Sequence, residues 1–126
     1  MDAEVYSLSI NGIEYVPKSS IKSETAEKLD GLEYVIIRSY DAGCFAGYLK
    51  DKKDENRIVT LIKARRLWYW DGAASLSQLA MEGVAKPENC KFPCEVDNII
   101  IYNVCEIISA TEKAKKSING VKVWKK

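Results

Sequence analysis

The sequence predicts an α+β domain in which two short helices accompany a mainly antiparallel sheet. Several runs rich in β-branched and aromatic residues are separated by turn residues, which is the pattern of strands. Two capping-box patterns, at residues 75–78 and 109–112, mark the starts of two helices. No repeat or linker interrupts the 126 residues, so we expect one small domain over 1–126.

Residues 1–17 are predicted to form an N-terminal hairpin extension. Val5–Ile10 and Ile13–Val16 alternate apolar and polar residues, and the Asn-Gly pair at 11–12 separates them. Both residues of an Asn-Gly turn readily adopt positive φ, which a tight hairpin requires. Pro17 ends the second strand, because proline cannot donate to the strand ladder.

The segment 18–31 is polar and weakly periodic, so we expect a loop with at most one helical turn. Residues 32–126 then form the main sheet and the helices. The second of the four main strands contains Gly47, which indicates a bulge or a close backbone contact. The third strand is long and bent near its middle. The fourth is the most apolar and is expected at the centre of the sheet. These strands are predicted at Glu33–Tyr40, Cys44–Lys50, Arg57–Trp70 and Asn98–Ile108, with a charged turn at 51–56.

The two helices are predicted from their caps. Ser75 begins an S-x-x-Q box, and the short helix that follows ends at Gly83. Ser109 begins an S-x-x-E box that opens a second helix, which runs to Asn119 and is terminated by Gly120.

Composition excludes several classes of chemistry. The chain has no histidine, which rules out Ser-His-Asp and Cys-His catalytic sets and histidine metal ligands. Its four cysteines lack the paired spacing of a zinc site and favour small buried thiols, so we expect no metal and no cofactor. The N-terminus does not resemble a secretory signal, and no apolar run approaches the ~20 residues of a membrane span, so we expect a cytoplasmic protein.

Charge is unevenly distributed although the net charge is only +1. Residues 57–66 and 113–126 are basic and contain no acid. A near-neutral chain with local basic patches suits a small anionic ligand better than a long nucleic acid.

Arginines are predicted beside aromatic residues on two strands. Alternation places Arg66, Trp68 and Trp70 on one side of the long strand, and places Arg38 among aromatic and aliphatic neighbours on another. A cation on an apolar face costs several kcal/mol to bury unpaired. It therefore needs an acidic partner, a route to solvent or an anionic ligand.

Each of these residues also has a structural explanation. Trp68 and Trp70 are typical of a core, and Arg65 and Arg66 could be surface or ion-paired residues. Phe92, which precedes a proline, could anchor an edge strand or expose a stacking ring. Composition and spacing alone therefore lead to a small α+β domain that could bind a nucleotide-like anion.

Four stretches together resemble the first Thoeris anti-defence family of small phage-encoded proteins. The resemblance runs over Tyr34 to Ile118, and the hairpin before Pro17 lies outside it as a variable extension. The stretches are "IIRSYDAGCFAGYL", "ARRLWYWDGAASLSQLAMEGV", "ENCKFPCEV" and "IISATEKAKKSI".

This resemblance implies a non-enzymatic protein of the host bacterial cytoplasm. Members of the family sequester cyclic ADP-ribose-type signals made by bacterial TIR enzymes and do not cleave them. Some also hold cyclic di- or trinucleotides in a separate site, and members assemble as homodimers or hexamers. A ligand with a pyrophosphate and a flat adenine suits arginines that lie beside aromatic rings.

The resemblance also implies roles for individual residues. Arg38 is expected on the ligand phosphates, Phe92 against the adenine, and Asn103 as a hydrogen-bond partner. Arg65 or Arg66 is expected to supply the second cation. The candidates for a second site at a subunit boundary are Arg57 and Lys63.

Other functions remain open from the sequence. The protein could inhibit a host defence protein through an aromatic patch or a free sheet edge. It could instead hydrolyse a nucleotide with a carboxylate base, although Asp71, Glu82 and Glu106 have easy structural explanations. A nucleic-acid binder would use the lysine-rich C-terminal tail and would bind with a steep salt dependence.

Overall fold

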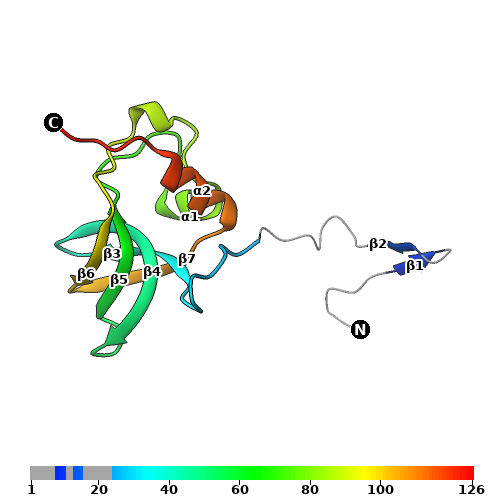
Figure 1. The fold of residues 1–126 in the computed structure, drawn as a ribbon, viewed down its shortest axis with the longest axis horizontal. Helices are drawn as coiled ribbons and strands as arrows, with labels where there is room; N and C mark the ends of the chain where they lie inside the picture. The colour runs from blue at the N-terminus through cyan, green and yellow to red at the C-terminus, as the bar shows by residue number, and fades with distance from the viewer. Residues whose placement is uncertain (1–7, 11–12, 16–23) are drawn as a thin grey trace.

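A computed structural model describes residues 8–10, 13–15 and 24–126. It confirms the α+β class, because a five-stranded antiparallel sheet packs with two helices (Figure 1). The strand order of the sheet is β6-β5-β4-β3-β7. Among the described residues, no helix is long and apolar enough to cross a membrane.

The elements follow the predicted order, except that two strands replace the single strand predicted over 98–108. Their bounds are β1 Leu8–Ile10, β2 Ile13–Tyr15, β3 Tyr34–Ser39, β4 Gly43–Lys53, β5 Ile58–Arg66, α1 Leu76–Glu82, the 3₁₀ turn η2 Pro87–Asn89, β6 Val96–Ile101, β7 Val104–Ser109 and α2 Glu112–Gly120. β1 and β2 pair antiparallel, with Leu8 opposite Tyr15, as the predicted hairpin requires. The Asn-Gly pair at 11–12 and residues 18–23 of the predicted loop lie outside the described residues, and residues 24–31 contain no helix, as the loop prediction allows.

The β4–β5 hairpin is displaced from its predicted limits. β4 continues to Lys53 through charged residues of the predicted turn, because exposed residues at the end of a hairpin can pair without being apolar. The chain reverses at Asp54, Glu55 and Asn56, which all adopt left-handed φ values of 51°, 54° and 70°. β5 ends at Arg66, so the predicted continuation of this strand to Trp70 is wrong.

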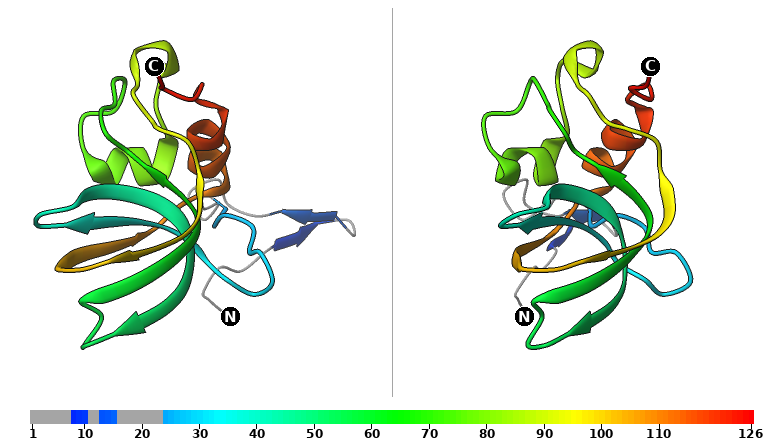
Figure 2. Two further views of the ribbon diagram at one scale, coloured as in Figure 1. Left: turned by 60° about the vertical axis from the view of Figure 1, so that its left-hand side comes forward. Right: turned by 90° about the vertical axis from the view of Figure 1, so that its left-hand side faces the viewer.

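The apolar run 98–108 does not form one central strand. It belongs to two strands, β6 and β7, which occupy opposite edges of the sheet. Ile101 still pairs with β5, whereas Val104 already pairs with β3, and Asn103 between them has a φ of 55°. The sheet curls strongly enough for its two edges to approach at this corner (Figure 2).

A bulge bends β5 near its middle, as the sequence predicts. Lys63 is the extra residue and has a φ of 49°, and Gly47 of β4 lies opposite it. A Cβ atom on Gly47 would lie 3.0 Å from the Cα of Ala64 and 3.1 Å from the carbonyl oxygen of Ile62. Glycine is therefore required here by the close approach of two backbones.

The curled sheet buries side chains on both of its faces. One group, the inner cluster, lines the inside of the curl: Val35, Ile37, Phe45, Val59, Leu61, Ala64, Ile101 and Val104. A second group, the helix-side cluster, lies between the sheet and the helices and includes Tyr34, Ile36, Ala46, Leu79, Phe92, Ala114 and Ile118. Each large apolar side chain buried in this way contributes roughly 1.5–3 kcal/mol of transfer free energy.

Helix α1 begins and ends as predicted. The Ser75 hydroxyl accepts the backbone N–H of Gln78 at 3.1 Å. Gly83 terminates the helix with a φ of 80°, which a residue with a Cβ atom adopts only with strain.

The predicted start and end of α2 are corrected. Thr111, and not Ser109, is the cap: its hydroxyl accepts the N–H of Ala114 at 3.0 Å and donates to the carbonyl of Met81 at 2.7 Å. Ser109 is still the last residue of β7, and the helix runs through Gly120. Thr111 therefore both caps α2 and fixes it against the end of α1.

Candidate ligand-binding site

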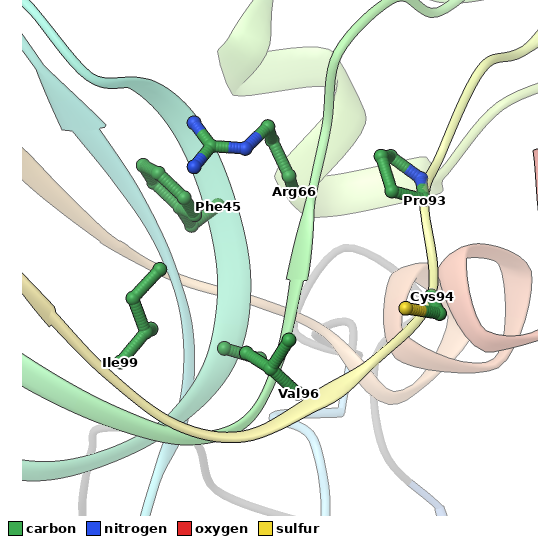
Figure 3. A pocket seen from close by; sticks show the side chains of 7 residues that line it. Phe45, Arg66, Pro93, Cys94, Val96 and Ile99 are labelled. Carbon is green, nitrogen blue, oxygen red and sulfur yellow. The ribbon is translucent and has the colours of Figure 1, made fainter.

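Arg66 occupies the last position of β5, directly opposite Phe45 of β4. Its guanidinium carbon lies 4.4 Å from the centre of the Phe45 ring, and its Nη1 donates to the carbonyl of Ala42 at 2.7 Å. Figure 3 shows the two side chains next to each other. Phe45 is buried and Arg66 is exposed, so solvent reaches the guanidinium on the side away from the ring. A guanidinium has five N–H donors, and most of them remain available to a ligand.

Three adjoining hollows share Arg66 as a wall. The first, of about 140 Å³, is apolar and lies against Val96, Ile99 and Cys94 (Figure 3). The second, of about 330 Å³, lies toward Trp68 and Trp70. The third, of about 310 Å³, lies toward β6 and the β6–β7 corner. A fixed cation at the junction of apolar and aromatic walls can hold the phosphate of a ligand whose flat part lies in a neighbouring hollow.

Trp68 and Trp70 reach this site by a different path from the predicted one. They follow the end of β5 in irregular chain and so do not alternate with Arg66 along a strand. Trp68 is 63% exposed, and Trp70 is half-buried against the helix-side cluster. The structure nevertheless brings both together with Arg66, since all three line the second hollow.

Arg65 is a structural residue, and its predicted role as a ligand cation is wrong. Only 5% of it is exposed, and its guanidinium donates to the carbonyls of Pro93 at 2.9 Å, Ile118 at 2.7 Å and Phe92 at 3.0 Å. Burial lowers the pKa of this arginine. Three carbonyls thus satisfy the Arg65 cation on the helix-covered face, which leaves Arg66 as the candidate of the two adjacent arginines.

Phe92 does not expose a stacking ring. It is fully buried in the helix-side cluster, and its ring centre lies 5.5 Å from the guanidinium carbon of Arg65. Its carbonyl also accepts the N–H of Trp124 at 3.0 Å. The predicted contact with adenine is therefore wrong for this chain on its own, because other groups cover the ring.

Arg38 is exposed but lies on the face of the sheet opposite to Arg66. It is the cross-strand partner of Cys44, whereas Arg66 is the partner of Phe45, and adjacent residues of a strand point to opposite faces. Its Nε donates to Glu106 Oε1 at 2.8 Å, and this hydrogen bond raises the pKa of Arg38. Among the described residues, none accepts a hydrogen bond from its two Nη groups. A single chain does not bring Arg38 and Arg66 to one ligand.

Asn103 lies beside the site and supports it indirectly. Its side-chain amide donates to Asp41 Oδ2 at 2.9 Å, and its carbonyl accepts the N–H of Tyr40 at 3.1 Å. Both contacts hold the turn between β3 and β4. Sequence reasoning missed Asp41, Phe45 and Tyr102, which line the hollows around Arg66. The turn residues Asp-Ala-Gly after Tyr40 were the only signal that could have indicated one of them.

Comparison with known protein families gives a match over most of the chain. Residues 32–118 match the family described as "Domain of unknown function (DUF6948)". The chain belongs to the DUF6948 family. The matched region begins just before β3 and ends within α2, so it contains the whole main sheet and α1. No curated protein and no solved structure matches the chain.

The candidates for a second site are separate from these three hollows of the DUF6948 domain. Arg57 pairs with Asp54 at 3.5 Å and lines a hollow of about 280 Å³ near Glu106. Lys63 is exposed in the β5 bulge. Their role at a subunit boundary stays a prediction.

The cysteines of the DUF6948 domain are all free thiols. Cys90 is buried, Cys44 and Cys105 are half-buried, and Cys94 is exposed in the first hollow. Burial raises the pKa values of the Cys44 and Cys90 thiols. Within the part of the chain that the structure describes, no three cysteine or carboxylate side chains gather as metal ligands would.

Proposed function

We propose that this protein binds and sequesters a cyclic nucleotide signal of the cyclic ADP-ribose type without cleaving it. It would act as a phage anti-defence protein in the host bacterial cytoplasm, as its resemblance to the first Thoeris anti-defence family implies. The observation that supports this proposal most strongly is the position of Arg66. This exposed cation stands at the junction of three hollows and has no acidic partner among the described ion pairs.

The walls around Arg66 suit the parts of such a ligand. The guanidinium can bind two phosphate oxygens at once, and Phe45 behind it keeps water from one side. Trp68 offers an exposed ring on which an adenine can stack, an interaction of about 1–3 kcal/mol per base. Trp70 closes the inner side of the same hollow.

In this proposal, Arg38 contacts the ligand from a second copy of the chain. Because Arg38 and Arg66 lie on opposite faces, a ligand held by both would have to lie between two protomers. The homodimer or hexamer that the resemblance implies would provide this arrangement. Arg57 and Lys63 would then serve a separate site for cyclic di- or trinucleotides.

Sequestration and cleavage are distinguished by the fate of the ligand. The protein is mixed with cyclic ADP-ribose isomers, freed of unbound ligand and denatured by heat, and the released molecules are identified by mass. We expect intact ligand in a fixed ratio to protein. A cleaved product would support the alternative of a carboxylate-dependent nucleotide hydrolase. Retention of no isomer would refute the proposal.

A protein-interaction inhibitor is the second candidate, because β6 is an edge strand with exposed apolar side chains. Val96 and Ile100 of β6 are 40% and 50% exposed, and Tyr102, which follows the strand, is 58% exposed. An exposed edge of this kind can pair with a strand of another protein. This candidate predicts a stoichiometric protein partner that is lost in Ile100→Asp and retained in Arg66→Ala. The sequestration proposal predicts no such partner.

A further inference from the structure

Asp41 and Arg66 line the same two hollows and are not paired with each other among the described ion pairs. Both residues are exposed, and both are among the side chains that line the second and third hollows. The guanidinium instead donates to the carbonyl of Ala42, the residue next to Asp41. A cation and an anion therefore border the same space with their charges still available to a third group.

The Asp41 carboxylate is fixed by one hydrogen bond. Its Oδ2 accepts the side-chain amide of Asn103 at 2.9 Å. Its Oδ1 lies 3.3 Å from the Ser39 hydroxyl, but that hydroxyl also lies 2.6 Å from the carbonyl of Tyr102. A serine hydroxyl has only one proton, and a carbonyl can only accept, so the shorter contact takes the proton.

The Ser39 hydroxyl cannot then satisfy Asp41 as well. It accepts the N–H of Ala42 at 3.2 Å and donates to the Tyr102 carbonyl, which leaves no proton for Oδ1. Among the described contacts, the Ser39 hydroxyl is the one donor within reach of Oδ1, and its proton is used by the Tyr102 carbonyl, so Oδ1 can accept from another group. It suits a hydroxyl or amine of a ligand.

We infer that the Asp41 carboxylate accepts a hydrogen bond from a ribose hydroxyl of the nucleotide whose phosphate binds Arg66. The inference rests on the proposed function and names the chemical class of the ligand: a ribonucleotide that carries a free hydroxyl close to its phosphate. Carboxylates accept ribose hydroxyls in this way in dinucleotide-binding folds. A phosphate alone would be repelled by Asp41, whereas a ribose phosphate satisfies both charges of the site.

The variant Asp41→Asn distinguishes a hydrogen bond to the ribose from simple repulsion of the phosphate. The first interpretation predicts weaker ligand binding by the variant, and the second predicts tighter binding. In the variant, the oxygen of the introduced amide must accept the side-chain amide of Asn103, so the introduced NH₂ group turns toward the hollow. A ligand hydroxyl then loses its charged acceptor. If Asp41 only repels the phosphate, removing its charge should tighten binding. Asp97→Asn is the matched control, because Asp97 is exposed on β6, outside the hollows, and the variant loses the same charge.

The experiment is a calorimetric titration of wild type, Asp41→Asn and Asp97→Asn. The ligands are the tightest-binding cyclic ADP-ribose isomer and its analogues that each lack one ribose hydroxyl. We expect wild type to bind one analogue about tenfold more weakly than the parent, the scale of a hydrogen bond to a charged group. Asp41→Asn should bind the parent isomer more weakly than wild type by a similar factor. It should bind that analogue as tightly as it binds the parent isomer. Asp97→Asn should match wild type.

Two results would overturn the inference while leaving the proposed function intact. They are equal binding of all analogues by wild type, and parent binding by Asp41→Asn that is unchanged or tighter. If wild type binds no cyclic nucleotide at all, the proposed function fails and the inference fails with it. Thermal unfolding of each variant checks its fold, and Asp41→Ala replaces Asp41→Asn if the latter is unstable.

Discussion

Arg65 and Arg66 are adjacent in the chain but point to opposite faces of the sheet. Arg65 is buried on the helix-covered face and donates to three backbone carbonyls. Arg66 is exposed above the Phe45 ring and donates to one carbonyl. One arginine therefore holds the fold together, and its neighbour is available to a ligand.

Arg65→Ala should lower the free energy of unfolding by about 3 kcal/mol or more, because it leaves three carbonyls without their donor in the protein interior. Arg66→Ala should cost less than about 1 kcal/mol, since its side chain is exposed. Urea unfolding of the two variants measures this difference. Equal stabilities would contradict the structural role of Arg65.

Gly47→Ala should destabilise the protein by about 1–3 kcal/mol, because its Cβ atom would press on the backbone of β5 at the Lys63 bulge. Gly120→Ala is the control: no atom lies within 4 Å of its added Cβ, and alanine is the better helix former. We expect the control to be neutral or slightly stabilising by thermal unfolding. A neutral Gly47→Ala would exclude the close approach of the two strands.

Thr111→Ala should cost about 1–2 kcal/mol, because the side chain both caps α2 and donates to the end of α1. Ser109→Ala removes an exposed hydroxyl bonded to Glu33 and should cost less than about 0.5 kcal/mol. Chemical denaturation of the pair decides which residue is the cap. If Ser109→Ala is the more destabilising of the two, Ser109 is the cap, as the sequence predicts.

Alkaline pH should destabilise the protein through Tyr34. Only 1% of it is exposed, it packs edge-on against Tyr48 at 5.0 Å, and burial raises its pKa well above the usual value. The unfolded tyrosine loses its proton near pH 10, whereas the folded one keeps it. The stability that Tyr34 contributes is therefore complete below about pH 10 and falls above it, by at most about 1.4 kcal/mol per pH unit.

Comparison of wild type with Tyr34→Phe from pH 8 to 11 isolates this contribution, because other titrating groups are common to both proteins. The difference in unfolding free energy should be constant up to about pH 10 and then shift against wild type. Parallel curves over the whole range would show that Tyr34 does not titrate differently in the two states.

Local signals in the sequence were sufficient for much of the fold. The Ser75 cap, the Gly83 stop and the requirement for Gly47 are each set by a few neighbouring residues, and all three are confirmed. The split of 98–108 into two edge strands is different. It depends on Asn103 adopting a left-handed conformation and on the curl of the whole sheet, which no local apolar pattern contains.

The site was only partly accessible to sequence reasoning for the same reason. Alternation correctly separates Arg65 from Arg66, but it cannot say which face the helices cover. Arg65 and Phe92 are buried because they lie on the side of the sheet that the helices cover. Asp41 joins the site through the β3–β4 turn, which is distant in sequence from Arg66. Which residues line the candidate site therefore depends on the tertiary fold, and the type of ligand that they bind stays a prediction.

The most direct test of the central claim is calorimetric titration of wild type, Arg66→Ala and Arg57→Ala with cyclic ADP-ribose isomers. Arg57 is another exposed arginine outside the three hollows, so its variant controls for the loss of one positive charge. We expect at least one isomer to bind wild type and Arg57→Ala alike and to bind Arg66→Ala at least about tenfold more weakly. Undiminished binding by Arg66→Ala, or no binding by wild type, would contradict the claim.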